Sequence, residues 1–228
     1  MSRSWLLTVA VIAALVSSTL AQCVTYGFCG TDEDSGKPLP CAVKRDPVSI
    51  ESDFLEGACP ALVDSNGKPV PACCDAKQAN SIKSELKTIT ALGVSTSSKC
   101  FKNFQNLVCQ AFCSPGQSGF VAVNGTSTSE EGGQPSATEM VYALNTSFAQ
   151  QVFDACKDVR TIIFGTHLMR YMCGKPADGK CTPQTFLDFV GAVHSEGGYS
   201  PLKIHHVLTE SSITVDGQEL EPFSPEIL

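Results

Sequence analysis

The sequence predicts an α+β fold, with helices packed on a small mixed sheet and many disulfides, and three observations support this class. The chain of 228 residues opens with an export signal. It then contains twelve cysteines, an even and dense set that is typical of disulfide-rich secreted domains. After residue 75, apolar residues recur at helical spacing in some segments and alternate in others, which indicates a mixture of helices and strands.

Residues 1–21 have the three parts of a secretory signal peptide. Arg3 supplies the positive charge, Leu6–Val16 is apolar, and small residues stand at the cleavage positions before Gln22. We therefore expect a mature domain over residues 22–228, whose formal charge changes from −7 to −8 when Arg3 is removed. No later apolar run approaches the ~18 residues of a spanning helix, so we expect no membrane span and a soluble product.

All twelve cysteines follow the predicted signal, and we expect them to form six disulfides. None of them has the C-x₂-C spacing of a zinc site, and the secretory pathway is oxidising. The sequence alone leaves on the order of 10⁴ pairings open for six bridges. Two glycosylation sequons, at Asn124 and Asn145, agree with export and predict surface positions.

Residues 23–73 are rich in turn residues and predict a loop region held by disulfides. The pattern changes at Asp75, which occupies an N-cap position, with Gln78 three residues later as in a capping box. A helix is predicted from there to about Gly93. Its apolar face would carry Ile82, Leu86 and Ile89 beside Gln78.

Segment 99–113 predicts a second helix, which Ser114-Pro115-Gly116 ends. Two of its cysteines, Cys109 and Cys113, are one turn apart and share a face. Its apolar face consists of Phe101, Phe104, Val108 and Phe112.

Shorter patterns complete the mixture of elements. Thr146 begins a third helix, and Thr182 with Pro183 begins a fourth that reaches Val193. Residues 127–134 are polar and Gly-rich and predict a loop. Strands are predicted at 120–123, 140–144, 202–207 and 213–215.

The sequence contains no arrangement of residues that indicates catalysis. The G-x-S-x-G, H-E-x-x-H and phosphate-loop motifs are absent. His205 and His206 would face opposite sides of a strand, so they are a poor chelating pair. We therefore expect no enzyme activity, no cofactor and no metal. The absence of a basic patch argues against nucleic acid as a partner.

Several short blocks carry a family resemblance. They are Gln22–Gly30, Cys73–Asp75, Asn103–Cys109, Phe112–Pro115 with Gln117, Asp154–Val159, Cys173–Lys175 and Ala177-Asp178. In this order they resemble the N-terminal lumenal domain of Niemann-Pick type C1 proteins, from about residue 22 to about residue 207. Several blocks at family spacing are a more specific signal than a lone motif.

The resemblance implies an α+β domain that binds one sterol in a deep apolar pocket. Full-length relatives receive sterol from a soluble carrier protein in late endosomes or lysosomes, and a long membrane-spanning portion follows the domain. We therefore expect a cholesterol-like or ergosterol-like ligand and a soluble sterol carrier as partner. The expected location is the secretory pathway, either extracellular or in an endosomal, lysosomal or vacuolar lumen.

The resemblance also implies a disulfide pairing, and it bears on whether the chain is a free-standing protein or a fragment. The family has a further cysteine where this chain has Ser97, and the tail cysteine that would pair with it is missing as well. We therefore expect a free-standing homologue, with a fragment of a longer membrane protein as the alternative. The implied pairs are Cys23–Cys73, Cys29–Cys41, Cys59–Cys109, Cys74–Cys113, Cys100–Cys156 and Cys173–Cys181.

At the hydroxyl-binding end of the implied pocket, this chain departs from the family. Gln78 matches a glutamine that bonds the sterol 3β-hydroxyl, although the same side chain could instead close the capping box. The other family residues at this end are replaced by Thr25, Phe28 and Pro40. We expect this end to be more apolar than in animal sterol binders and its recognition of the hydroxyl to be relaxed.

The remaining lining positions that the resemblance implies are apolar or aromatic. Phe186, Phe189 and the pair Tyr171-Met172 would form the wall, and Pro201-Leu202 the entrance. Ile82 and Val108 also match lining positions. For each of them, packing in an ordinary core is the alternative.

These observations predict a secreted or lumenal protein that binds and carries a sterol and does no chemistry. One alternative is a cysteine-rich binding module for another lipid or a vitamin, which a pocket with several polar groups would favour. A second alternative is a secreted interaction protein or inhibitor with a filled core, which an exposed apolar patch without a cavity would favour.

Overall fold

The computed structural model of the chain describes residues 22–128, 133–162, 165–174 and 179–228. The predicted signal peptide at 1–21 lies outside the described residues, as do part of the predicted loop at 127–134 and the block Ala177-Asp178. The described part is an α+β fold, as the sequence predicts.

Four of the described helices begin where the sequence predicts them, because side chains cap their first turns. They are α2 (Ala76–Ala91), α3 (Lys99–Cys113), α4 (Thr146–Lys157) and α6 (Pro183–Val190). Asp75 accepts a hydrogen bond from the Gln78 amide at 2.8 Å, and the Gln78 side chain accepts one from the Asp75 amide, which completes a capping box. Ser98 and Asn145 cap the next two helices. One further helix, α5 (Met169–Met172), has no side-chain cap and was not predicted, because a single turn shows no periodicity.

Helix α6 is shorter than predicted, since it ends at Val190 and not at Val193. The carbonyl oxygen of Gly191 accepts a hydrogen bond from the Ile204 amide at 2.9 Å. A Cβ at Gly191 would lie 2.1 Å from the carbonyl oxygen of Ile204, so only glycine allows this approach to strand β7 (Lys203–Thr209). The chain turns here to meet the sheet.

Residues 23–73 contain regular structure, so the predicted loop region was wrong. The elements are β1 (Cys23–Thr31), β2 (Pro38–Arg45), β3 (Val48–Ile50), α1 (Ser52–Glu56), a 3₁₀ turn (Pro60–Leu62) and β4 (Val70–Ala72). The register between β1 and β2 shifts three times, and Gly27 in β1 has a φ of 69°. These bulges disrupt the alternation of side chains that identifies a strand, and Pro38 and Pro40 are typical of turns.

The main sheet is mixed, as predicted. Its order is β1-β2-β6-β5, and β7 also pairs with β6. β6 and β7 are parallel, whereas the other pairs are antiparallel. The further strands are β5 (Val121–Ser127), β6 (Ser136–Asn145), β8 (Ile213–Val215) and β9 (Gln218–Leu220).

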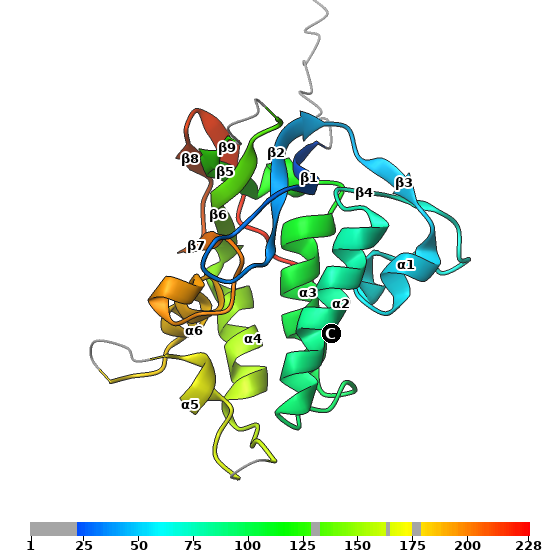
Figure 1. The fold of residues 1–228 in the computed structure, drawn as a ribbon. Coiled ribbons are helices and arrows are strands. Elements are labelled where there is room, and N and C mark those ends of the chain that lie inside the picture. The colour runs from blue at the N-terminus through cyan, green and yellow to red at the C-terminus, as the bar shows by residue number, and fades with distance from the viewer. Residues whose placement is uncertain (1–21, 129–132, 163–164, 175–178) are drawn as a thin grey trace, which may run out of the picture.

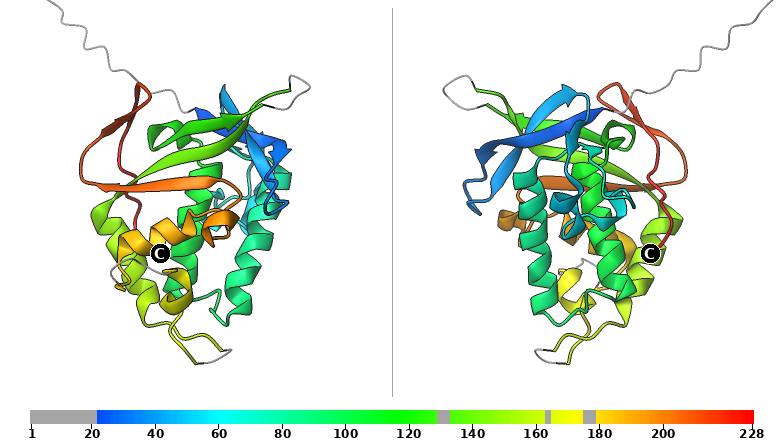
Figure 2. Two further views of the ribbon diagram at one scale, coloured as in Figure 1. Left: turned by 60° about the vertical axis from the view of Figure 1, so that its left-hand side comes forward. Right: turned by 90° about the vertical axis from the view of Figure 1, so that its right-hand side faces the viewer.

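Strand β6 is covered on both faces. Met140, Tyr142 and Leu144 belong to the main core, as their predicted alternation indicates. Val141 belongs to a second, small cluster with Leu220 of the β8–β9 hairpin. Figure 1 shows α2, α3 and α4 side by side below the sheet strands, and the turned views of Figure 2 agree.

The structure contains the six disulfides that the family resemblance implies. The two adjacent cysteines before α2 take different partners, because Cys73 bonds to Cys23 in β1 and Cys74 bonds to Cys113 at the end of α3. The first turn of α2 is therefore fixed to both elements. The other bonds are Cys29–Cys41, Cys59–Cys109, Cys100–Cys156 and Cys173–Cys181.

Candidate functional site

An apolar pocket lies among α2, α3, α5, α6, the β1–β2 hairpin and residues 199–204. Its volume is about 360 Å³, which lies in the range of small-molecule sites. The pocket reaches the surface beside two exposed aromatic residues that line it, Tyr171 and Tyr199, whose exposed fractions are 40 % and 69 %.

Helix α2 supplies the longest wall of this pocket. Its lining residues extend from Gln78 to Leu92, which at ~1.5 Å per residue is about 21 Å of helix. This length suits an elongated ligand. The lining residues of this wall are Gln78, Ser81, Ile82, Glu85, Leu86, Thr88, Ile89 and Leu92.

The facing walls are mostly apolar and aromatic. Helix α3 contributes side chains at a spacing of four residues, so they share one helix face. The lining residues outside α2 are Phe28, Pro38, Pro40, Phe104, Val108, Phe112, Tyr171, Met172, Phe189, Val190, Tyr199, Ser200, Pro201 and Ile204.

Most of the residues proposed for the site from the sequence lie on this pocket. Nine of the twelve line it: Phe28, Pro40, Gln78, Ile82, Val108, Tyr171, Met172, Phe189 and Pro201. Three do not, namely Thr25, Phe186 and Leu202. The hydroxyl of Thr25 accepts a hydrogen bond from Gln117 Nε2 at 2.8 Å in a fully buried position. The Phe186 ring packs behind the wall, 6.3 Å from the Phe104 ring.

Several lining residues were seen in the sequence only as parts of apolar helix faces. Leu86 and Ile89 continue the face of Gln78, and Phe104 and Phe112 flank Val108. Periodicity identified these faces but not whether each faces a core or a pocket. Tyr199 and Ser200 had no sequence signal, because they lie in an irregular segment before β7.

Gln78 has a defined orientation in the pocket wall. Its Oε1 accepts hydrogen bonds from the Asp75 amide at 3.1 Å and from the Gly27 amide at 2.7 Å. Because backbone N–H groups only donate, the amide oxygen must face them. Nε2 has no hydrogen-bond partner among the residues that the structure describes. Capping and ligand binding are therefore compatible, since Oε1 serves the first and Nε2 remains for the second.

The pocket wall carries little charge. Among the described lining residues, Glu85 has the only charged side chain, and Lys37 pairs with it at 2.8 Å. Within the described ranges, no cluster of His, Cys, Asp or Glu could hold a metal ion. In that same part of the chain, no helix is long and apolar enough to cross a membrane. A neutral apolar molecule with one hydrogen-bond acceptor matches this lining.

The adjacent histidines lie apart from the pocket and face opposite sides of β7, as predicted. His205 is exposed and its Nε2 lies 3.1 Å from Glu139 Oε2. His206 is buried against the Tyr142 ring, at 5.8 Å between centroids. Burial lowers the pKa of His206 from its usual 6.5 to about 4.

The two predicted glycosylation sites differ in their surroundings. Asn124 is exposed on β5. Asn145 is partly buried, and its side chain caps α4 and donates a hydrogen bond to Glu210 Oε2 at 3.0 Å. Glycosylation of either one stays a prediction.

Comparison with known proteins agrees with the sequence resemblance. The chain is 29 % identical to the NPC1-like intracellular cholesterol transporter 1 of Homo sapiens over 97 % of its own length, and 32 % identical to that of Rattus norvegicus over 76 %. It is 26 % identical to the NPC intracellular cholesterol transporter 1 of Sus scrofa over 82 %. The chain spans only 13 to 17 % of the length of these relatives.

The match to a family model is broader than any of the blocks noticed in the sequence. The model of the Niemann-Pick C1 N terminus matches residues 20–228, which include every described element. The chain belongs to the Niemann-Pick C1 N-terminal family.

Proposed function

We propose that this domain binds one sterol in the pocket beside α2 and passes it on without chemical change. The observation that carries this proposal is the amide of Gln78. Among the described residues its Nε2 is an unpaired donor, at one end of the long α2 wall, which faces mostly apolar and aromatic side chains. The relatives named above are cholesterol transporters by name, which supports a sterol as the ligand class.

Apolar burial can supply the affinity. A sterol offers roughly 400 Å² of apolar surface, which gives about 10 kcal/mol at ~25 cal/mol per Å². Association and side-chain ordering offset several kcal/mol of this, and sub-micromolar binding remains. One hydrogen bond from Gln78 would then set the orientation of the ligand rather than most of its affinity.

The same family membership supports a proposal for the partner and the location. We propose a secreted or lumenal domain, with the signal at 1–21 removed, that exchanges sterol with a soluble carrier protein. We propose an endosomal, lysosomal or vacuolar lumen as the compartment, and the names of the relatives support an intracellular location.

Lipid analysis tests the proposed function directly. The protein should be purified from a eukaryotic secretory host and its bound lipids extracted and identified by mass spectrometry. We expect one sterol per chain, and saturable binding of a fluorescent sterol to delipidated protein. A phospholipid or a vitamin in the extract, with no competition by sterol, would contradict the proposal.

A substitution of Gln78 can separate its two roles. Gln78→Glu keeps an oxygen for the Asp75 and Gly27 amides but replaces the Nε2 donor with an acceptor, and those two N–H groups favour the ionised form. We expect affinity for a 3-ketosterol, which only accepts, to fall about tenfold, or ~1.4 kcal/mol. Affinity for a 3β-hydroxysterol, which can donate, should change less.

Gln78→Ala is the matched control, because it removes the cap as well as the donor. It should lower the melting temperature more than Gln78→Glu does, since the Asp75 and Gly27 amides lose their acceptor. If Gln78→Glu bound the ketone as tightly as the unaltered protein does, Gln78 would be removed from the ligand site.

Recognition of the hydroxyl should be relaxed, because Phe28 and Pro40 line the pocket without a side-chain hydrogen-bonding group. We expect competition binding to distinguish the 3β- from the 3α-hydroxyl epimer by less than about a hundredfold, or ~2.7 kcal/mol. A larger preference would mean that polar groups other than Gln78 anchor the hydroxyl.

A further inference from the structure

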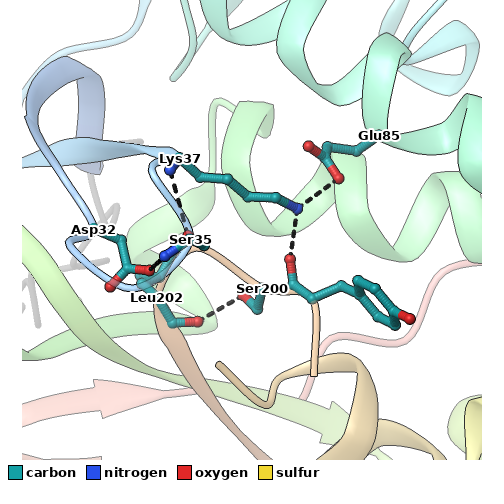
Figure 3. Close-up of polar contacts among 7 residues, drawn as sticks. Asp32, Ser35, Lys37, Glu85, Ser200 and Leu202 are labelled. Carbon is teal, nitrogen blue, oxygen red and sulfur yellow. Dashed lines mark hydrogen bonds and ion pairs between the residues drawn. The ribbon is translucent and has the colours of Figure 1, made fainter. Parts of the chain in front are cut away.

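One lysine connects three segments that surround the pocket. Lys37, at the end of the β1–β2 turn, places its Nζ 2.8 Å from Glu85 Oε2 on α2. The same Nζ lies 2.8 Å from the carbonyl oxygen of Tyr199, in the segment that leads into β7. Figure 3 shows the lysine reaching across from the hairpin to Glu85. Glu85 and Tyr199 both line the pocket.

The hairpin turn that carries Lys37 is well ordered by its own hydrogen bonds. The carboxylate of Asp32 accepts hydrogen bonds from the amide and the hydroxyl of Ser35, at 2.9 and 2.5 Å. The Asp32 amide donates to the carbonyl oxygen of Lys37 at 2.8 Å, and Gly36 takes the φ of 68° that the turn requires. Lys37 therefore extends from a fixed base (Figure 3).

The segment on the other side of the contact turns at Tyr199, which lies between two residues held by backbone hydrogen bonds. Before this tip, the Gly198 amide donates to the Val193 carbonyl oxygen at 3.0 Å. At its base, the Ser200 amide donates to the Ala192 carbonyl oxygen at 3.0 Å, and the Ser200 hydroxyl donates to the Leu202 carbonyl oxygen at 2.6 Å. At its tip, Tyr199 is mostly exposed, and its ring forms a T-shaped pair with the Phe189 ring, with centroids 6.2 Å apart. The bond from Lys37 is the polar contact that joins this tip to the hairpin and α2.

We propose that Lys37 is a latch across the mouth of the pocket, which limits how fast a ligand enters and leaves. The proposal rests on the proposed function, since the ligand is the sterol assigned there. The side chains of Lys37 and Glu85 are 26 % and 53 % exposed. Because a partly exposed ion pair is weak, the latch opens readily and contributes little to stability. Its effect is therefore on the rate of exchange.

The structure predicts a specific kinetic signature for such a latch. It joins the hairpin, α2 and the segment at Tyr199 without touching the Gln78 end of the pocket. Opening is then needed for both binding and release, in the free and the loaded protein alike. Loss of the latch should raise both rates by a similar factor and leave the dissociation constant nearly unchanged.

Lys37→Met removes the charge and both bonds but keeps the aliphatic stem. We expect stopped-flow mixing with dehydroergosterol to show association and dissociation rates raised about fivefold, with the dissociation constant changed by less than about twofold. Between ~0.05 and ~0.5 M NaCl, the rates of the unaltered protein should rise toward those of the variant, whose own rates should respond less.

Lys157→Met is the matched control, because Lys157 forms an equally short ion pair with Asp154 on α4, at 2.8 Å and away from the pocket. It should leave both rates unchanged. Equal rates in the two lysine variants, or a changed dissociation constant with an unchanged association rate, would overturn the latch.

Hydrogen exchange distinguishes failure of the latch from failure of the proposed function. In ligand-free protein, amides of residues 198–204 should exchange faster in Lys37→Met than in Lys157→Met, and this result would support the latch even if no sterol bound to any variant. Absence of binding to the unaltered protein would contradict the sterol proposal alone. Equal exchange in both variants would contradict the latch, whatever the ligand.

Discussion

Replacement of Val108 by tryptophan is expected to lower sterol affinity by about a hundredfold or more, or ~2.7 kcal/mol. Val108 lies in the α3 wall of the pocket and is only partly buried. The larger side chain would occupy the space that the ligand needs. The ligand-free protein has room for it, so the free energy of unfolding should change by less than about 1 kcal/mol. Fluorescent-sterol titration and thermal unfolding of the same variant measure both effects.

The matched control is Val152→Trp on the neighbouring helix α4. Val152 is buried to 1 % exposure and does not line the pocket. Overpacking there should cost about 1–3 kcal/mol of stability. A similar loss of stability in Val108→Trp, with sterol affinity retained, would mean that the region is a filled core, as in an interaction protein without a ligand.

Acidification is expected to destabilise the protein through His206. The pKa of this buried side chain is about 4 in the folded chain and about 6.5 when unfolded. Between these values the unfolded chain binds a proton that the folded chain does not, so stability falls as the pH falls through this window. The full loss is about 3 kcal/mol near pH 4, and about 2 kcal/mol is lost by pH 5.

Urea unfolding at pH 7 and pH 5 measures this effect, with the disulfides intact. His206→Phe keeps a ring against Tyr142 but does not titrate, so its loss of stability between the two pH values should be smaller than that of the unaltered protein by about 2 kcal/mol. His205→Gln is the control, because His205 is exposed beside Glu139, and it should retain the original pH dependence. An unchanged pH dependence in His206→Phe would show that His206 does not cause the loss of stability at acid pH.

Local features explain which helices could be predicted from the sequence. α2 begins at a capping box between Asp75 and Gln78, and Thr182 with Pro183 opens α6. Each of these signals lies within four residues, so it can be recognised without knowledge of the tertiary contacts. The end of α6 was wrong because it depends on Gly191 meeting Ile204 of β7, which no local pattern reveals.

The hairpin β1–β2 was missed for a different reason. Its bulges shift the register three times and break the alternation on which strand prediction depends. The disulfide pairs could be stated only through the family resemblance, since the cysteine spacing leaves thousands of pairings open. They match the bonds in the structure.

Core and pocket are lined by the same kinds of side chain, and this limited the prediction of the site. Val108 and Phe189 line the pocket, whereas Phe186 packs behind its wall and Leu202 is fully buried beside it. Periodicity places each residue on a helix face or a strand, but what that face meets depends on elements distant in the chain. Nine of the twelve residues that the resemblance implied line the pocket, and geometry separated the wall from the layer behind it.

Residue type and local spacing were sufficient for the α+β class, the disulfide-rich nature, the starts of α2, α3, α4 and α6 and the capping role of Gln78. The candidate ligand role of Gln78 came from the family resemblance. The separate roles of Oε1 and Nε2 in Gln78 could be assigned only from the tertiary structure, because the Gly27 amide that binds Oε1 is 51 residues away. The contacts of Lys37 with Glu85 and with Tyr199 join residues 48 and 162 positions apart, so they too could be found only from the tertiary structure. Hydrogen-bond direction and packing are set by which groups meet in space, and chain folding brings those groups together over distances that a sequence pattern does not encode.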